Sequence, residues 1–136
     1  MDQRTHEQIA SHLCGRPVEL GQGRARVALE AAGEMAADRR GLVHGGFTFG
    51  LADYAAMLAV NEPTVVLASA QVKFLGPVVV GDRVEAEAAV ERTEGRKRWV
   101  KVLVKKGGAP VFEGEFLAVV LDGHILDAGR GGEARR

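Results

Sequence analysis

The chain has 136 residues, of which 46% are hydrophobic and 26% charged, values that exclude a disordered or a fibrous protein. Its 18 Lys and Arg residues balance 18 Asp and Glu residues, so the formal net charge at pH 7 is +0. Domains that bind nucleic acid carry a basic excess or many aromatic residues, and only 5% of this chain is aromatic. No nucleic-acid partner is therefore expected.

The sequence also indicates where the protein works and which kinds of site it lacks. The first thirty residues contain no apolar run typical of a signal peptide, and no stretch reaches the roughly 18 apolar residues that span a bilayer. We therefore expect a cytoplasmic protein with no membrane contact. Cys14 is the only cysteine and lies in a polar segment, which indicates an incidental thiol and excludes an intramolecular disulfide. The histidines have no metal-site spacing, so no metal is expected (His6, His12, His44 and His124).

The N-terminal part predicts a helix followed by a strand. Ile9 and Leu13 are four residues apart and indicate a short amphipathic helix over residues 5–13. Polar and apolar residues alternate over 24–31, as in a half-buried strand. We expect residues 1–14 to form a helical extension, 15–127 a single domain, and 128–136 a flexible tail rich in Gly and Arg.

The segment FTFGLADYAAMLAVN, residues 47–61, predicts a helix of about four turns that is apolar or small on every side. A surface helix has a polar face, so a helix without one must be buried. About 15 residues are too few to cross a membrane. The rest of the protein is therefore expected to surround this helix.

Four later segments alternate between apolar and polar residues and predict strands (66–74, 84–91, 100–105 and 112–120). Turn residues such as Gly76-Pro77 and Glu94-Gly95 separate them, which favours a four-stranded antiparallel meander. The last strand has a second apolar face that includes Leu117 and Val119. We expect another subunit or the N-terminal helix to cover that face.

Asp53 is the only charged residue of the expected central helix. Carboxylates are rarely buried without a partner, so Asp53 either faces solvent or a neighbouring amide, or lines a cleft as a general base or nucleophile. Gly45 and Gly46 directly precede the helix. Unpaired N–H groups there can bind a developing negative charge, although a tight turn alone would also explain the glycines.

His44-Gly45-Gly46 followed by Leu51-Ala52-Asp53 resembles the hot-dog fold acyl-CoA thioesterase superfamily, particularly its phenylacetate-pathway branch. The segments Phe74-Leu75-Gly76-Pro77 and Val80-Gly81-Asp82 are similar to places where that family ends one strand and begins the next. The resemblance covers roughly residues 15–121. It implies an α+β fold in which an antiparallel sheet of about five to six strands wraps around a central α-helix.

The resemblance also implies roles for individual residues. Asp53 corresponds to the catalytic carboxylate, and the N–H of Gly46 to the donor for the oxyanion. His44 corresponds to a residue that orders the loop, with direct proton transfer as the lesser alternative. Asp38 stands where the family often has Asn: it could position water as an acceptor, or indicate a changed or weakened reaction. A second carboxylate near Asp53 would raise one of the two pKa values.

The remaining implied contacts concern the substrate and the assembly. Gly45 and Phe47 beside the helix start are expected to bind the substrate. Arg96 and Lys97 follow a turn and could contact the CoA phosphates, although a basic turn is more often simply solvated. The family shares its site between two subunits, so we expect a homodimer or a homotetramer.

The function that the resemblance implies is hydrolysis of a small or medium acyl or aryl CoA thioester to the free acid and CoA, with no cofactor. One alternative is a hydratase or dehydratase acting on an enoyl-CoA, a reaction that the same fold hosts. Another is a protein that binds acyl-CoA without catalysis, like the hot-dog regulators of lipid synthesis, whose corresponding strand is similar to residues 111–116.

Overall fold

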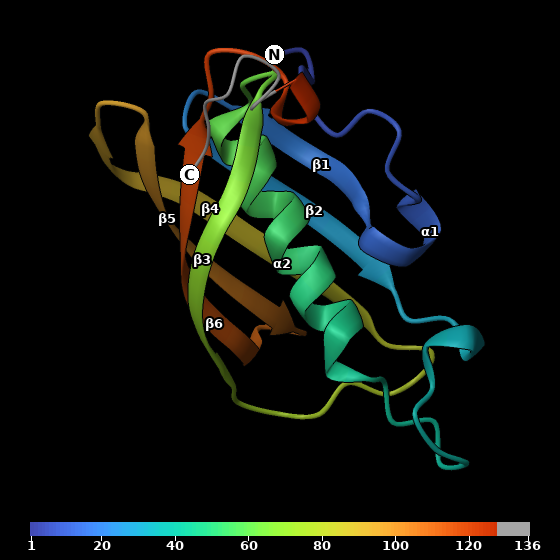
Figure 1. Cartoon of the computed structure of the whole chain (residues 1–136). Coiled ribbons are helices and arrows are strands. Elements are labelled where there is room, and N and C mark those ends of the chain that lie inside the picture. Colours follow the sequence, from blue (N-terminus) through green and yellow to red (C-terminus); the bar gives the residue numbers. More distant parts are fainter. Residues whose placement is uncertain (128–136) are drawn as a thin grey trace.

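In the computed structural model, which describes residues 1–127, an antiparallel six-stranded sheet curves around one long helix (Figure 1). The helices are α1 (Ser11–Cys14) and α2 (Gly45–Val60), with 3-10 turns at Gly33–Met35 and Ile125–Asp127. The strands are β1 (Arg16–Gly21), β2 (Arg24–Glu30), β3 (Val65–Phe74), β4 (Arg83–Glu94), β5 (Lys97–Lys106) and β6 (Ala109–Val120). This is the α+β arrangement that the sequence predicts.

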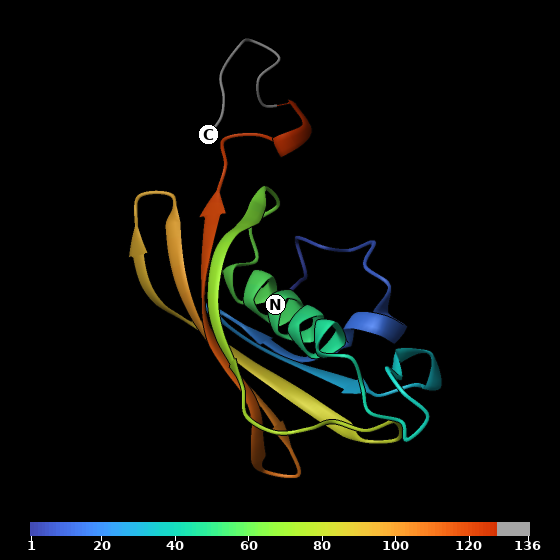
Figure 2. The same cartoon turned by 60° about the horizontal axis from the view of Figure 1, so that its bottom comes forward.

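Helix α2 is buried in the concave side of the sheet, as Figure 2 shows from near its end. Nine of its 16 residues are buried, so the prediction of a helix that the protein surrounds is confirmed. The fully buried side chains that face it from the sheet are aliphatic or aromatic (Val27, Val84, Val100, Val102, Val104, Phe112 and Phe116). The alternation of each strand places these residues on one face, and burying them drives the sheet to close over the helix.

The predicted meander of four strands is wrong in one respect. The strand order is β1-β2-β4-β5-β6-β3, so β3 lies beyond β6 and does not pair with β4. The Gly76-Pro77 segment is no hairpin, because residues 75–82 cross the end of the sheet. Its backbone bonds to other segments on the way: Leu75 N–H donates to Val111 O over 2.8 Å, and Val43 N–H donates to Val78 O over 2.8 Å.

The N-terminal part also differs from the prediction. The helix covers only Ser11–Cys14, and the strand β1, which the sequence does not predict, pairs with β2. Most of β1 is exposed on both sides, so it has no alternation to recognise. Residues before α1 run along α2, where Gln3 Nε2 donates to Tyr54 Oη over 3.1 Å. α1 itself packs against α2 and β2 and does not cover the outer face of β6.

The two edge strands of the sheet are unequal. β1 has six residues, contains Pro17, and has a bulge between Pro17 and Glu19, all of which discourage pairing with another strand. β3 has ten residues, no proline and a bulge between Leu67 and Ser69. Its last residue, Phe74, lies on the inner face opposite the buried Phe112, although it is 56% exposed at the end of the strand. β3 therefore presents an open edge. The predicted tail, residues 128–136, lies outside the described residues.

Candidate functional site

Helix α2 begins at Gly45, immediately after the extended residue His44. The preceding loop is fixed by backbone hydrogen bonds, in which His44 N–H donates to Met35 O over 3.0 Å and Phe47 N–H donates to His44 O over 3.0 Å. Within residues 1–127, the N–H groups of Gly45 and Gly46 have no hydrogen-bond acceptor. The start of α2 therefore presents two free donors and the positive end of the helix dipole.

Aromatic rings lie directly against these two glycines. A Cβ added at Gly45 would be 3.1 Å from Cε2 of Phe74, and one added at Gly46 would be 3.1 Å from Cδ2 and 3.3 Å from Nε2 of His44. The edge of the His44 ring also faces the ring of Phe47, with 6.3 Å between the centroids. Any larger residue at position 45 or 46 would displace a ring, so glycine keeps the free N–H groups accessible to a ligand.

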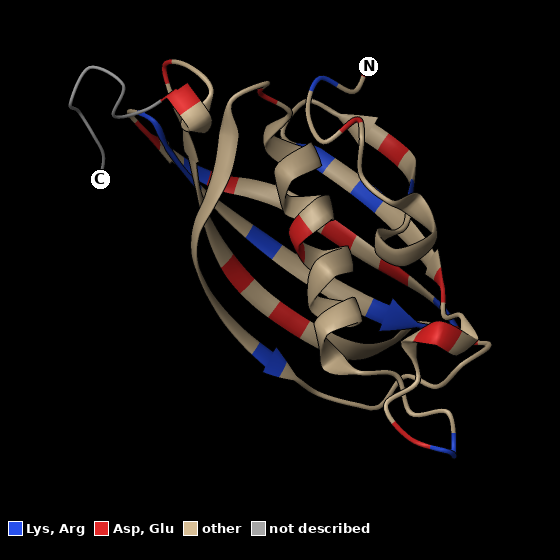
Figure 3. Ribbon diagram, turned by 45° about the vertical axis from the view of Figure 1, so that its right-hand side comes forward, with Lys and Arg blue, Asp and Glu red and all other residues tan. Residues whose placement is uncertain are grey.

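Asp53 lies two turns further along α2 and is the only charged residue of that helix (Figure 3). Its side chain is half-buried, and its Oδ1 atom is inaccessible and has no hydrogen-bond partner within the described residues. Burial raises the pKa of this carboxyl to about 6. A carboxylate with this pKa is largely ionised at neutral pH and accepts a proton readily, which suits a general base.

Cys14 belongs to the same region, although the sequence indicates an incidental thiol. It is half-buried against the core at the end of α1. Burial raises the pKa of its thiol, and the nearby Asp53 carboxylate adds to this effect. Cys14 therefore lies within electrostatic range of Asp53. Its position in a polar segment gave no signal of that proximity.

Asp38 lies on an exposed turn and organises the loop. Its Oδ1 accepts hydrogen bonds from the N–H of Arg40 over 2.9 Å and from the N–H of Leu42 over 3.1 Å. Burial alone accounts for the raised pKa of Asp53, with no contribution from Asp38. The structure therefore does not bring the two carboxylates of one chain together, and Asp38 is not a cause of the raised pKa of Asp53.

Arg96 and Lys97 lie at the opposite end of the sheet from Gly45 in the same chain. Lys97 pairs with Val119 near the end of β6, whereas Phe74, which contacts Gly45, pairs with Phe112 near its start. Seven residues of strand separate these two places, a distance of roughly 23 Å. Arg96 forms an ion pair with Asp122. One chain by itself therefore does not combine this basic pair with the start of α2.

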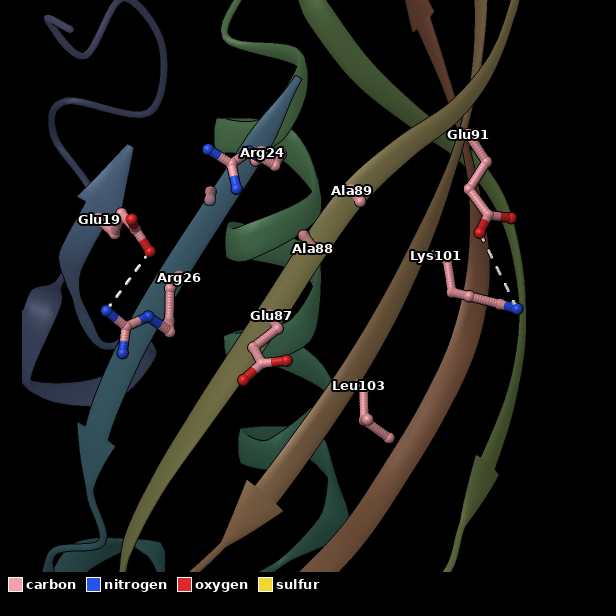
Figure 4. A pocket seen from close by; sticks show the side chains of 10 residues that line it. Glu19, Arg24, Arg26, Glu87, Ala88, Ala89, Glu91, Lys101 and Leu103 are labelled. Atoms are coloured by element: carbon pink, nitrogen blue, oxygen red, sulfur yellow. Dashed lines mark ion pairs between the residues drawn. The ribbon is translucent and has the colours of Figure 1, made fainter. Parts of the chain in front are cut away.

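A shallow hollow on the outer face of the sheet has no connection with Asp53. Figure 4 shows its lining side chains on β1, β2, β4 and β5, with α2 behind the sheet. Charges of opposite sign pair across the strands there: Arg26 Nη2 is 3.4 Å from Glu19 Oε1, and Lys101 Nζ is 4.0 Å from Glu91 Oε2. Exposed pairs of this kind contribute little to stability and mark a solvated face.

Two negative findings limit the kinds of site that the described part of the chain can form. Within residues 1–127, no group of three or more His, Cys, Asp or Glu side chains is placed to hold a metal ion. No helix among the same residues is both long enough and apolar enough to cross a membrane.

Sequence reasoning missed an aromatic cluster beside the start of α2. Phe49 of α2 and the sheet residues Phe74, Phe112 and Phe116 form a continuous series, with ring centroids 5.1 to 6.4 Å apart. The rings extend from the core to the exposed Phe74 beside Gly45. The spacing of these residues in the sequence gives no hint of it, because the cluster depends on β3 pairing with β6.

The sequence of this chain matches a known protein family. Residues 40–113, more than half of the chain, match the family described as the thioesterase superfamily. The protein belongs to the thioesterase superfamily. The match begins at residue 40, after Asp38, and includes the start of α2 with its two glycines and Asp53.

Two solved structures show the same fold. An uncharacterised protein from Pyrococcus horikoshii has a TM-score of 0.92 at 52% identity, over 93% of this chain and 98% of that one. A mutant of the phenylacetic acid degradation protein PaaI from Thermus thermophilus has a TM-score of 0.73 at 32% identity, over 80% of this chain and 95% of that one. The hot-dog fold and the likeness to the phenylacetate-pathway branch are thus confirmed.

Two curated relatives are longer than this chain. A protein of Aquifex aeolicus named methylthioribose-1-phosphate isomerase is 54% identical over 89% of this chain, which spans only 26% of that relative. The transcription factor FapR of Caldanaerobacter subterraneus is 29% identical over 87% of this chain, which spans 60% of it. Each name describes a whole protein of which this chain matches a part.

Proposed function

We propose that this protein hydrolyses an acyl-CoA thioester to the free acid and CoA in the cytoplasm. The observation that carries the proposal is the Asp53 carboxylate, which is half-buried, has no partner at Oδ1 among residues 1–127 and has a pKa of about 6. No residue within 1–127 pairs with this buried oxygen, and leaving it unpaired costs free energy. The free N–H of Gly46 and membership of the thioesterase superfamily support the same reaction.

The chemistry requires two groups around one carbonyl. The N–H of Gly46 donates a hydrogen bond to the thioester oxygen, which becomes negative as the carbonyl carbon turns tetrahedral. The Asp53 carboxylate takes a proton from water as the water oxygen bonds to that carbon. When the intermediate collapses, the C–S bond breaks and the proton passes from Asp53 to the thiolate of CoA. Direct attack by the carboxylate, followed by hydrolysis of the anhydride, is the alternative course.

We infer that the site is completed by a second copy of the chain. Gly46 and Asp53 are seven residues apart on one helix, which separates them by about 10 Å along its axis. The carbonyl must lie about 3 Å from the N–H and a similar distance from the attacking oxygen. Two copies that pair through the open edge of β3 would bring the helices together, so that Asp53 of the partner subunit serves the Gly46 of this one.

The same pairing gives Arg96 and Lys97 a place in the proposal. Antiparallel pairing of two β3 edges would put the end of one sheet that carries Lys97 beside the end of the other sheet that lies against Gly45. Lys97 of the partner subunit would then lie at the end where α2 begins. The two basic residues are proposed to contact the phosphates of CoA, while Gly45 and Phe47 border the acyl group.

One other function has a specific observation in its favour. The chain is 29% identical to part of a transcription factor, so binding of acyl-CoA without hydrolysis is the second candidate. Binding without hydrolysis does not require a basic carboxylate, so that candidate does not explain the raised pKa of Asp53. The two functions differ in a single measurable respect, which is release of free thiol.

Thiol release from a panel of acyl-CoA substrates, measured for the wild type and for Asp53→Asn, tests the proposal. We expect turnover by the wild type and a loss of at least about a hundredfold in kcat for the variant. Asn keeps the size of the side chain and removes its basicity. Equal rates in the two proteins would reject the role of Asp53, and tight binding without turnover would favour the second candidate.

A further inference from the structure

Phe74 is an aromatic side chain that lies beside the free N–H groups at the start of α2. β3 ends at the same end of the molecule at which α2 begins (Figure 1). The Cε2 atom of Phe74 would be only 3.1 Å from a Cβ at Gly45, and Phe74 is nevertheless 56% exposed. A carbonyl oxygen that accepts the N–H of Gly45 or Gly46 would therefore bring its acyl group close to this ring.

The ring of Phe74 is held in place by its neighbours. It packs edge to face on the buried Phe112, with 5.1 Å between the centroids and 80° between the planes. The backbone that follows is held by the carbonyl oxygen of Val111, which accepts the N–H of Leu75 over 2.8 Å and that of Gly76 over 3.2 Å. The exposed part of the ring is therefore a fixed surface beside the helix start.

The surface around Phe74 is apolar. Nine large hydrophobic side chains are exposed among residues 1–127, and five of them lie at this end of the molecule (Leu42, Phe74, Leu75, Val79 and Val80). Leu42 and Val79 form a β-bridge, and Val80 N–H donates to Gly41 O over 2.8 Å. These bonds hold the loop before His44 against the segment that follows β3. An exposed apolar patch of this kind indicates a binding surface.

Two basic residues that are near Phe74 or Gly45 in the sequence lie away from the ring. Lys73 points to the other face of the sheet, because successive residues of a strand alternate, and it pairs there in register with Glu113. Arg40 lies five residues before Gly45, on the exposed turn that Asp38 organises. A negative group beside the ring would thus have neither cation as a direct neighbour.

We propose that Phe74 determines the acyl specificity of this protein, because its ring lines the acyl site, accepts uncharged apolar acyl groups and rejects those that carry a second carboxylate. This specificity rests on the proposed function, since it requires a thioester carbonyl at the start of α2. An apolar acyl group gains free energy when it leaves water for the ring. A carboxylate at the same place would lose its water and face the negative side of the aromatic π system.

Two thioesters of nearly the same shape test this specificity. Isovaleryl-CoA ends in an isopropyl group where malonyl-CoA has a carboxylate. We expect the wild-type kcat/KM, measured by thiol release, to favour isovaleryl-CoA by at least about a hundredfold. In Phe74→Arg the guanidinium would pair with the carboxylate, so this ratio should fall by about a hundredfold or reverse. A wild type that hydrolyses both thioesters equally well would overturn the proposal.

Val18→Arg is the matched control for the added charge. Val18 is also apolar and 45% exposed, but it lies on β1 at the opposite edge of the sheet from β3. The ratio between the two thioesters should therefore stay at the wild-type value in this variant. An equal change in Val18→Arg and Phe74→Arg would show a general effect of charge and overturn the role of the ring.

A double-mutant cycle tests the position of the ring, and it applies even if Phe74→Arg does not fold. Gly45→Ala adds a Cβ 3.1 Å from the ring and should displace it, so we expect kcat/KM for isovaleryl-CoA to fall by about threefold or more. In Phe74→Ala the space is open, and the same change at Gly45 should alter kcat/KM by less than about 1.5-fold. An equal loss in both backgrounds would overturn the placement of the ring in the acyl site.

Binding measurements separate this specificity from the proposed function. Absence of thiol release with every thioester would reject the proposed function. Calorimetry would then test Phe74 through Kd, which should favour isovaleryl-CoA over malonyl-CoA in the wild type and lose that preference in Phe74→Arg. Equal Kd values for the two thioesters in the wild type would overturn the role of Phe74.

Discussion

Gly46 and Asp53 lie on the same side of α2, separated by seven residues and thus by about 10 Å along the helix axis. The N–H of the first and the carboxylate of the second are the two groups that the proposed hydrolysis of a thioester uses. Their separation is too large for direct attack by Asp53 on a carbonyl held by the Gly46 of the same chain. Geometry within one helix therefore argues for a site assembled from two chains.

A mixed dimer tests this assembly. Asp53→Asn removes the base, and Gly46→Pro removes the N–H at a position in the first helical turn, where proline is tolerated. Each variant alone should be inactive. A hybrid purified through two different tags should recover about half of the wild-type turnover, because one of its two sites is intact.

A hybrid without activity would contradict a site shared between two chains. If Gly46 and Asp53 served one carbonyl within a single chain, neither half of the hybrid would contain a complete site and no activity would return. Thermal unfolding of Gly46→Pro is the necessary control, because its ring would displace His44, whose Cδ2 is 3.1 Å from the Cβ position.

The rate should depend on pH through Asp53. Because burial raises the pKa of this carboxyl to about 6, its basic form is lost as the pH falls below that value. We expect kcat/KM to rise about tenfold per pH unit up to pH 6 and to level off by about pH 7. Stopped-time thiol release from pH 4.5 to 8 measures the profile. A profile that is flat across pH 6, with the protein still folded, would contradict Asp53 as the base.

The stability of the folded protein should fall with rising pH because of Asp53, whereas the rate should rise. A carboxyl whose pKa is raised in the folded state binds its proton more tightly there, so the stability falls as the pH rises from about 4 through 6. Asp53→Asn removes the charge. We expect it to stabilise the protein at pH 8 by about 1 kcal/mol, allowing for water at the accessible oxygen, and to change little at pH 4.

Urea unfolding of both proteins at the two pH values measures the difference. Glu94→Gln provides the control, since Glu94 is exposed and its neutralisation should have the same small effect at either pH. A variant that is destabilised at pH 8 would show that the Asp53 carboxylate has a stabilising partner.

The buried central helix and the candidate site on it could be predicted from the sequence, because each depends on the residues of one short segment. The apolar character of residues 47–61 predicts a helix that the rest of the protein surrounds, and the charge of Asp53 on such a helix marks a candidate site. Glycines before a helix indicate free N–H groups wherever the helix begins. Each of these inferences needs only a single segment and the free energy of burying it.

The strand order and the contacts around the start of α2 could not be predicted, because they depend on how distant segments pair and local patterns do not encode that pairing. A turn at Gly76-Pro77 predicts a hairpin, but β3 pairs with β6, opposite Phe112 and Phe116, and not with β4. The contact of Phe74 with Gly45 follows from that pairing. Cys14 near Asp53 depends in the same way on where α1 packs.

Arg96 and Lys97 should affect the binding of CoA and not the chemical step. In Arg96→Ala and Lys97→Ala we expect KM for acyl-CoA to rise about three- to tenfold with kcat unchanged, because a charge-assisted contact to phosphate is lost. The KM for the corresponding acyl-pantetheine thioester, which lacks those phosphates, should stay the same. Lys105→Ala, on the solvated outer face, is the control. Equal effects on both substrates would show that the residues do not contact phosphate.

Asp38 should act through its hydrogen bonds and not through its charge. Its Oδ1 accepts the N–H groups of Arg40 and Leu42, and an amide oxygen can accept the same two bonds. We therefore expect Asp38→Asn to keep kcat within about twofold of the wild type, whereas Asp38→Ala releases both N–H groups and loosens the loop before His44. Thiol release by the two variants, followed as a function of pH, separates the possibilities. If Asp38 served as a second base, Asn and Ala would lower kcat equally and the pH profile of both would change, because neither side chain can take up a proton.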